Sequence, residues 1–172
     1  DAPKSFTVFS YVEFCLWNAV DDSTNFQRNF STGEVEVEGS TIYHKTEYRE
    51  RRDHYALYTV NAPVDGFDTS RDAFLGAWRS NSTPEAVEKG ACTNSVAHGW
   101  APVGVHQINV TLNPGESRSL IYMLGYIENP QEEKWAAPGV INKTRAHELM
   151  ARYATDAQVD EALARLHAHW NN

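Results

Sequence analysis

The sequence is short of cysteines, of basic residues and of long apolar runs. Only Cys15 and Cys92 are present, and neither lies in a CxxC pair, so a disulfide scaffold or a zinc framework is not expected. Lys and Arg total 15 against 23 Asp and Glu, a net charge of −8, which argues against a nucleic-acid partner. No stretch approaches the ~20 apolar residues that cross a bilayer, so no membrane partner is expected.

Several catalytic signatures are also missing. There is no glycine-rich phosphate loop, no HExxH and no GxSxG, and neither cysteine has local support as a nucleophile. The seven histidines are scattered without the spacing of metal ligands. We therefore assign no catalytic residue and expect no metal and no cofactor. The chain opens at Asp1 without a signal-peptide pattern, and we expect a cytoplasmic protein.

The 172 residues, 41% of them hydrophobic, suffice for one globular domain with a core. Strict alternation predicts half-buried strands at 34–38, with the acids outward, and at 106–112. Apolar runs at 5–17 and 119–127 predict strands buried on both faces. About eight strands in antiparallel pairing are expected. Because a domain seldom begins with a central strand such as 5–17, we expect a piece of a longer polypeptide.

Two helices are predicted at the C-terminal end. The period changes at Asn142, and we place the helices at 142–153 and 156–170. Thr155 and Gln158 form a capping box at the start of the second helix. Its apolar stripe comprises Val159, Ala162, Leu163, Leu166 and Trp170. Either the sheet or another domain could cover the two helices.

The segment 18–30 (NAVDDSTNFQRNF) is the most unusual loop because it is dense in amides. If Asp21 or Asp22 caps a helical turn, Asn25 and Arg28 share one face. Amides and guanidinium groups suit sugar hydroxyls, since they offer directed donors and acceptors. The other interpretation is a solvated loop with local Asx hydrogen bonds. The Arg-rich run at 49–52 leaves two similar alternatives, a salt-bridged sheet face or a phosphate contact.

The chain resembles the cellobiose phosphorylases of glycoside hydrolase family 94 over essentially its whole length. The run STGEVEVEGSTIYHKTEYRERRDHYALYTVN is the most specific part of the resemblance. Further matching segments are GFDT, FLG, CTNS, LNPGE and LGYIENP. Chitobiose and cellodextrin phosphorylases look similar in these motifs, so the subfamily stays open.

The resemblance implies a mainly β fold, an antiparallel super-sandwich that forms part of a galactose-mutarotase-like β-sandwich, followed by two C-terminal α-helices. By this match residues 1–135 form a partial sandwich and residues 136–172 form linker helices. The family's (α/α)6 catalytic barrel, with its general-acid Asp, is not matched by this chain. The chain alone is therefore expected to be inactive.

The resemblance implies an inverting reaction of cellobiose with phosphate, which gives α-glucose 1-phosphate and glucose. Inorganic phosphate is then a substrate. A homodimer partner is implied too, because the family's sandwich loop reaches the neighbouring subunit's active site. The residues that match this loop are Asn18, Asn25, Gln27 and Arg28, which we expect to contact sugar hydroxyls. The alternatives are an autonomous carbohydrate-binding module and a purely structural brace.

Overall fold

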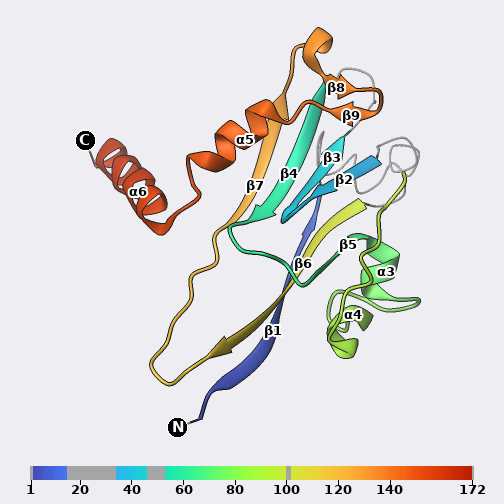
Figure 1. Cartoon of the computed structure of the whole chain (residues 1–172), viewed down its shortest axis with the longest axis vertical. Helices are drawn as coiled ribbons and strands as arrows, with labels where there is room; N and C mark the ends of the chain where they lie inside the picture. The colour runs from blue at the N-terminus through green and yellow to red at the C-terminus, as the bar shows by residue number, and fades with distance from the viewer. Residues whose placement is uncertain (1, 15–33, 46–52, 100–101, 172) are drawn as a thin grey trace.

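The computed structural model describes residues 2–14, 34–45, 53–99 and 102–171, and most of its secondary structure is antiparallel β-sheet (Figure 1). The first sheet has the order β1 (Lys4–Glu13), β6 (Pro102–Leu112) and β5 (Gly66–Ser70). The second has the order β2 (Glu34–Glu38), β3 (Thr41–Lys45), β4 (His54–Val60) and β7 (Tyr122–Glu128). A small hairpin joins β8 (Trp135–Ala137) to β9 (Val140–Ile141).

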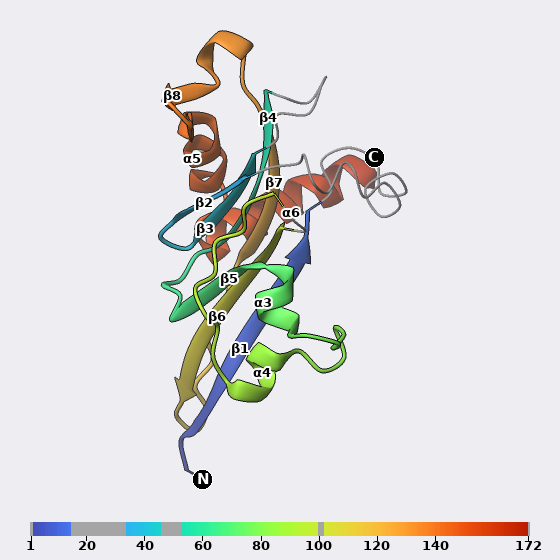
Figure 2. The same ribbon diagram turned by 90° about the vertical axis from the view of Figure 1, so that its right-hand side faces the viewer.

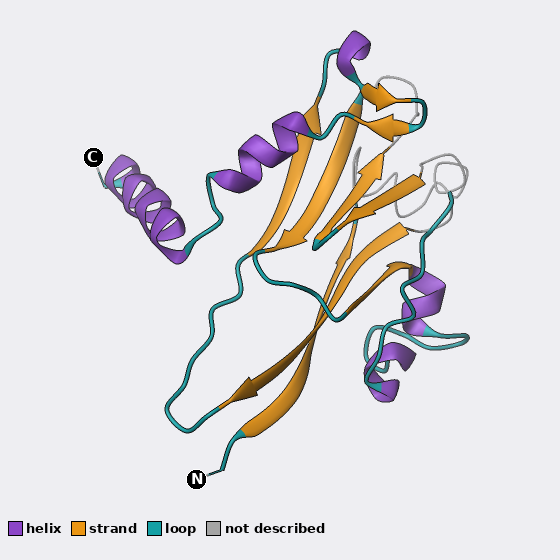
Figure 3. Cartoon of the chain, in the orientation of Figure 1, coloured by secondary structure: helices purple, strands orange, loops and turns teal. Residues whose placement is uncertain are grey.

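The described helices are short except for the last, and Figure 3 separates them from the strands by colour. They are α3 (Arg71–Leu75), α4 (Glu85–Lys89), the 3-10 turn η2 (Gln131–Glu133), α5 (Thr144–Ala151) and α6 (Asp156–Trp170). The predicted mainly β, antiparallel fold with two C-terminal helices is thereby confirmed.

The two sheets and the helices on their outer faces form four layers. Successive side chains of a strand point to opposite faces, so each sheet contacts a different layer on each side. In β6, Val103 and Val105 pack against Phe74 and Leu75 of α3, whereas Ile108 faces the second sheet. In the second sheet, Tyr43, Tyr55 and Leu57 face α5 on the other side. The order of layers is therefore α5, second sheet, first sheet, and α3 with α4 (Figure 2).

The two C-terminal helices are covered differently. Ala146 of α5 is fully buried against the second sheet, and Leu149 and Met150 pack beside it. The sheet thus supplies the surface that α5 needs. In α6, Leu163, Leu166 and Trp170 stay exposed, although the predicted capping box at Thr155 and Gln158 is formed. Among the described helices none has both the length and the hydropathy needed to cross a membrane.

Several features differ from the sequence-based prediction. The strand expected at 119–127 was predicted to be buried on both faces, but Leu124 and Tyr126 of β7 are exposed. Strand β1 was expected at the centre of a sheet, but it pairs only with β6 among the described strands and lies at an edge. Its N-terminal half is exposed, and its C-terminal half is partly buried on both faces, with Val8 towards the second sheet and Phe9 and Tyr11 towards α3. Strand β5 and the β8–β9 hairpin were not predicted, because both are short and lack an alternating apolar pattern.

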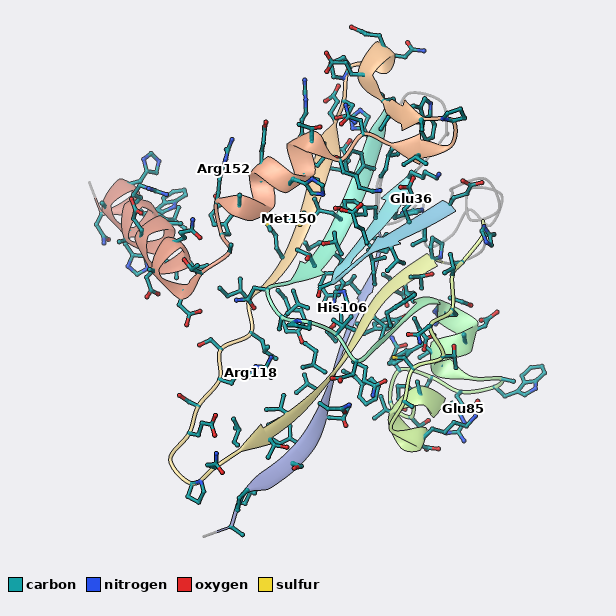
Figure 4. The ribbon with its side chains drawn as sticks, viewed as in Figure 1. Glu36, Glu85, His106, Arg118, Met150 and Arg152 are labelled. Carbon is teal, nitrogen blue, oxygen red and sulfur yellow. The ribbon has the colours of Figure 1, made fainter. Side chains whose placement is uncertain are left out.

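An aromatic stack crosses the interface between the sheets. His106 of β6 is fully buried (labelled in Figure 4) and packs with Tyr58 and Tyr122 in a group of three rings, with its ring centroid 4.7 Å from that of Tyr58 and 6.3 Å from that of Tyr122. Its Nδ1 lies 3.4 Å from Ser10 Oγ. Burial lowers the pKa of His106 to about 4, and the Ser40 backbone opposes this only in part. The imidazole is therefore neutral inside the fold.

We predict that protonation of His106 destabilises the fold. The side chain titrates near 6.5 when unfolded and near 4 when folded, so the unfolded chain binds more protons between these values. Stability is complete above pH 6.5 and falls as the pH is lowered towards 4, by about 3 kcal/mol for this group. Urea titrations over this range should show the loss in the wild type and a flatter profile in His106→Phe.

The matched control is His167→Gln, because His167 is exposed on α6. This variant should keep the wild-type pH profile. An unchanged profile in His106→Phe would contradict the assignment.

Candidate functional site

The four predicted sugar-contact residues, Asn18, Asn25, Gln27 and Arg28, lie outside the described residues. The same holds for the arginine run at 49–52. Both the predicted sugar contacts and the two interpretations of the arginine run therefore stay predictions. The residues at which these segments join the sheets are described, and they locate the segments within the fold.

The described strand ends that flank residues 15–33, 46–52 and 100–101 lie at one end of the two sheets (Figure 1). In the second sheet, Glu34 opens β2 and is the register partner of Lys45, the last residue of β3. In the first sheet, Glu13 closes β1 opposite Val103 at the start of β6. The candidate sugar loop and the arginine run are thus attached next to each other, although they are separate in the sequence.

A small apolar cluster ties the two sheets together at this end. Phe14, which precedes residue 15, packs against the buried cluster of Val35, Ile42 and Ala97. The rings of Phe14 and His44 have centroids 5.2 Å apart. Phe14 and Val35, which lie on either side of the segment 15–33 in the sequence, therefore meet in one cluster.

Polar contacts fix the end of β1 as well. The Tyr11 hydroxyl donates to Glu13 Oε1 at 2.5 Å, and Arg71 Nε donates to the same oxygen at 3.2 Å. The Tyr11 hydrogen bond, with help from Arg71, holds the pKa of Glu13 below its usual value despite partial burial. Glu13 is therefore ionised at neutral pH and acts as an acceptor, not as a proton donor.

A polar network that joins β2, β3 and β9 centres on Glu36 (labelled in Figure 4). Its carboxylate accepts from Lys143 Nζ at 2.8 Å, from the Ile141 backbone N–H at 2.9 Å and from Lys45 Nζ at 3.2 Å. Burial opposes ionisation, but these hydrogen bonds outweigh it and lower the pKa of Glu36. Glu36 was predicted to face solvent, yet β9 and the start of α5 partly cover it.

Lys45 connects this network to the end of β3. The side chain is almost fully buried, lies 2.9 Å from Glu34 Oε2, and also donates to the Gly139 carbonyl. Its Nζ lies 5.3 Å from the ring centroid of Trp135 in β8. A buried ammonium needs such partners, because without them the cost of desolvation is several kcal/mol. The network therefore binds the β8–β9 hairpin to Glu34, which follows residues 15–33, and to Lys45, which precedes residues 46–52.

A second buried carboxylate organises the 92–97 segment. Asp68 is fully buried and accepts from the Thr93 hydroxyl at 2.6 Å and from the Ser95 hydroxyl at 2.7 Å. The backbone N–H groups of Thr93 and Ser95 also donate to it. These donors saturate the carboxylate, so it holds the segment in place and is not positioned to transfer a proton.

Cys92 does not qualify as a nucleophile. Burial, reinforced by the negative charge of Asp68, raises the pKa of its thiol to about 12. The thiolate is the reactive species, and almost none of it is present at neutral pH. Within the described ranges, these groups build a frame and provide hydrogen bonds for it, and none of them forms an acid–base pair for catalysis.

The family model of the glycosyl hydrolase 94 supersandwich domain matches residues 1–156. The chain belongs to the glycosyl hydrolase 94 family. The expected family is confirmed at this level, and the antiparallel sheets agree with the supersandwich description.

Curated relatives match nearly the whole of this family 94 chain. It is 31% identical over 175 residues to an N,N'-diacetylchitobiose phosphorylase of Vibrio proteolyticus, and 28% identical over 173 residues to one of Vibrio furnissii. Each alignment covers 99% of this chain and 20% of the relative. A solabiose phosphorylase of Paenibacillus borealis is 27% identical over 95% of this chain. The chain thus spans about a fifth of the length of these relatives.

We predict that removing the charge of Glu36 destabilises the fold by weakening the network that holds β9 and the start of α5 against β2. Glu36→Gln keeps the shape but leaves two lysines without their shared anion, so we expect a loss of about 2 kcal/mol in the free energy of unfolding. Because the folded state lowers the pKa of Glu36, the difference from the wild type is full above pH 4.5 and shrinks as the pH falls below it. Chemical denaturation at several pH values measures this.

The control is Glu132→Gln, since Glu132 is an exposed acid of the η2 turn. It should change the free energy of unfolding by less than about 0.5 kcal/mol. Equal effects of the two substitutions would contradict a specific role of Glu36.

Proposed function

We propose that this chain is the sandwich part of an inverting disaccharide phosphorylase and that it contributes scaffold, dimer contacts and a substrate loop. The match to the family model over residues 1–156 carries this proposal. The relatives matched over 95–99% of the chain all have phosphorylase names, which supports a parent enzyme of this class. Other parts of the parent protein then provide the general acid and the donor-sugar pocket.

The proposed substrate is a β-linked disaccharide. Cellobiose was the first expectation from the sequence, but N,N'-diacetylchitobiose now ranks ahead of it, because both Vibrio relatives are named for that sugar. In the proposed reaction, an acid protonates the glycosidic oxygen as the bond to the anomeric carbon breaks. Phosphate attacks that carbon from the opposite face, which gives a sugar 1-phosphate with inverted configuration and releases the second sugar.

In this proposal Asn18, Asn25, Gln27 and Arg28 bind hydroxyl groups of the sugar that leaves. Their role is orientation, since amides and guanidinium groups do not transfer protons at neutral pH. The described residues that flank the segment 15–33 support this proposal, because Phe14 and Val35 pack in one apolar cluster. A loop whose ends are fixed loses less conformational entropy when it binds a ligand.

We predict that Arg28→Ala weakens binding of the acceptor sugar. In a polypeptide that also contains the catalytic barrel, the KM for the acceptor in the synthetic direction should rise about tenfold, which corresponds to ~1.4 kcal/mol. The kcat should change much less, because a hydroxyl contact of this kind binds ground state and transition state alike. Sugar 1-phosphate consumption measures both constants with N-acetylglucosamine and with glucose as acceptor.

Arg118→Ala serves as the control, because Arg118 is exposed on the long connection between β6 and β7, which in Figure 4 lies on the opposite side of the sheets from α3 and α4. Its kinetic constants should equal those of the wild type. An unchanged KM in Arg28→Ala would overturn the loop assignment but leave the phosphorylase proposal in place. Absence of phosphorolysis with both disaccharides would overturn the latter.

The second candidate is an autonomous carbohydrate-binding module, favoured by the aromatic content of 12%. It predicts that the 172-residue chain alone binds cellobiose or N,N'-diacetylchitobiose. Our proposal predicts no saturable binding below about 1 mM, because a few hydroxyl contacts give little net affinity. Calorimetric titration of the isolated chain distinguishes the two, and submillimolar binding would favour the module.

A further inference from the structure

Three potential metal ligands converge where β4 begins and β7 ends. His54 and Glu128 are register partners on these two strands, so their side chains lie on the same face of the sheet. Asp53 directly precedes β4, and its backbone carbonyl accepts from the Asn129 N–H at 3.1 Å. The backbone pairing of β4 with β7, which are labelled in Figure 1, therefore holds all three residues at one place.

The orientation of His54 is fixed by its other neighbour. The side chain is only 7% exposed, and its ring lies against that of Tyr126, with centroids 5.0 Å apart. The Tyr126 hydroxyl is hydrogen-bonded to Nδ1. Metal-binding histidines commonly donate one ring N–H to such a neighbour, which fixes the tautomer and leaves the other nitrogen free to bind the metal. In His54 that other nitrogen is Nε2, and it faces the two carboxylates.

The distances are too long for hydrogen bonds but suit a shared cation. Nε2 lies 3.5 Å from Asp53 Oδ1 and 3.7 Å from Glu128 Oε1, and the three ligand atoms lie within 4.8 Å of one another. A tetrahedral zinc ion with bonds of about 2.0–2.2 Å separates its ligand atoms by roughly 3.4 Å. Only a small contraction of the cluster is therefore needed.

Among the described residues, His54 is the charged group nearest to both carboxylates. In the described part of the chain, neither the Asp53 nor the Glu128 carboxylate has a hydrogen-bond or ion-pair partner apart from His54. Two adjacent carboxylates repel each other, and a divalent cation removes this repulsion. Asp53 is 21% exposed and Glu128 is 65% exposed, so an ion and its water can enter from the Glu128 side.

We propose that Asp53, His54 and Glu128 bind one Zn²⁺ ion, with water completing the tetrahedron. One imidazole and two carboxylates match the ligand preference of zinc, whereas Mg²⁺ and Ca²⁺ prefer oxygen ligands alone. The ion cross-links the start of β4 to the end of β7 and so stabilises this end of the second sheet. Sequence spacing did not reveal the site, because β7 is far from β4 in the chain.

The test uses the 172-residue chain, stripped of metal with EDTA and dialysed. Calorimetric titration with Zn²⁺ should give one ion per chain with a Kd below about 10 μM, and zinc should raise the Tm. Co²⁺ should give the visible absorption bands of a tetrahedral site. Glu128→Gln and His54→Gln should each weaken zinc binding by about 10–100-fold.

Matched controls are Glu148→Gln and His167→Gln, which alter exposed side chains on α5 and α6 and should bind zinc like the wild type. Glu128 is largely exposed, so its variant should retain the wild-type circular dichroism spectrum even if the His54 variant unfolds. Absence of zinc binding, or wild-type affinity in Glu128→Gln, would overturn the proposal. The cluster would then be a structural contact between the start of β4 and the end of β7 that binds no metal.

Discussion

The central strands β4 and β6 are buried on both faces, and this requirement determines the architecture. Alternate side chains of each strand point to opposite sides, so each strand needs a cover on both. The two sheets cover each other's inner faces, while α5 covers one outer face and α3 with α4 covers the other. At Gly104 a side chain would collide with Tyr58, since a Cβ there would lie 2.7 Å from a Tyr58 ring carbon. The sheets can approach closely only because this residue is glycine.

Elements with local signals were predictable from the sequence. Helix α6 begins and ends where its period and its capping box at Thr155 place it. The edge position of β1 was not predictable, because apolar residues on both faces are typical of a central strand and pairing partners are a long-range property. Strand β5 was missed for a different reason. Its buried Asp68 breaks the apolar pattern, and only the donors of Thr93 and Ser95 make that burial tolerable.

The candidate site shows the same division between local and long-range information. Residue types in the segment 18–30 suggest sugar contacts, and the family match gives them a context. What the sequence cannot reveal is that this segment and the run at 49–52 are attached side by side, because that depends on the pairing of Glu34 with Lys45. The role of Glu36 was likewise hidden. Alternation places it outward, but the distant residues Ile141 and Lys143 fold back over it.

The charges at this end of the molecule bear on which substrate group the chain could hold. Lys45 and Lys143 both form ion pairs with glutamates of β2. The carboxylates largely neutralise the positive charge of these lysines, which weakens their attraction for a phosphate. Phosphate contacts, if this chain makes any, would therefore need cations other than these two lysines. A neutral sugar meets no such obstacle, because it is held by directed hydrogen bonds and not by net charge. The electrostatics of the frame thus favour a role in holding the departing sugar over a role in holding phosphate.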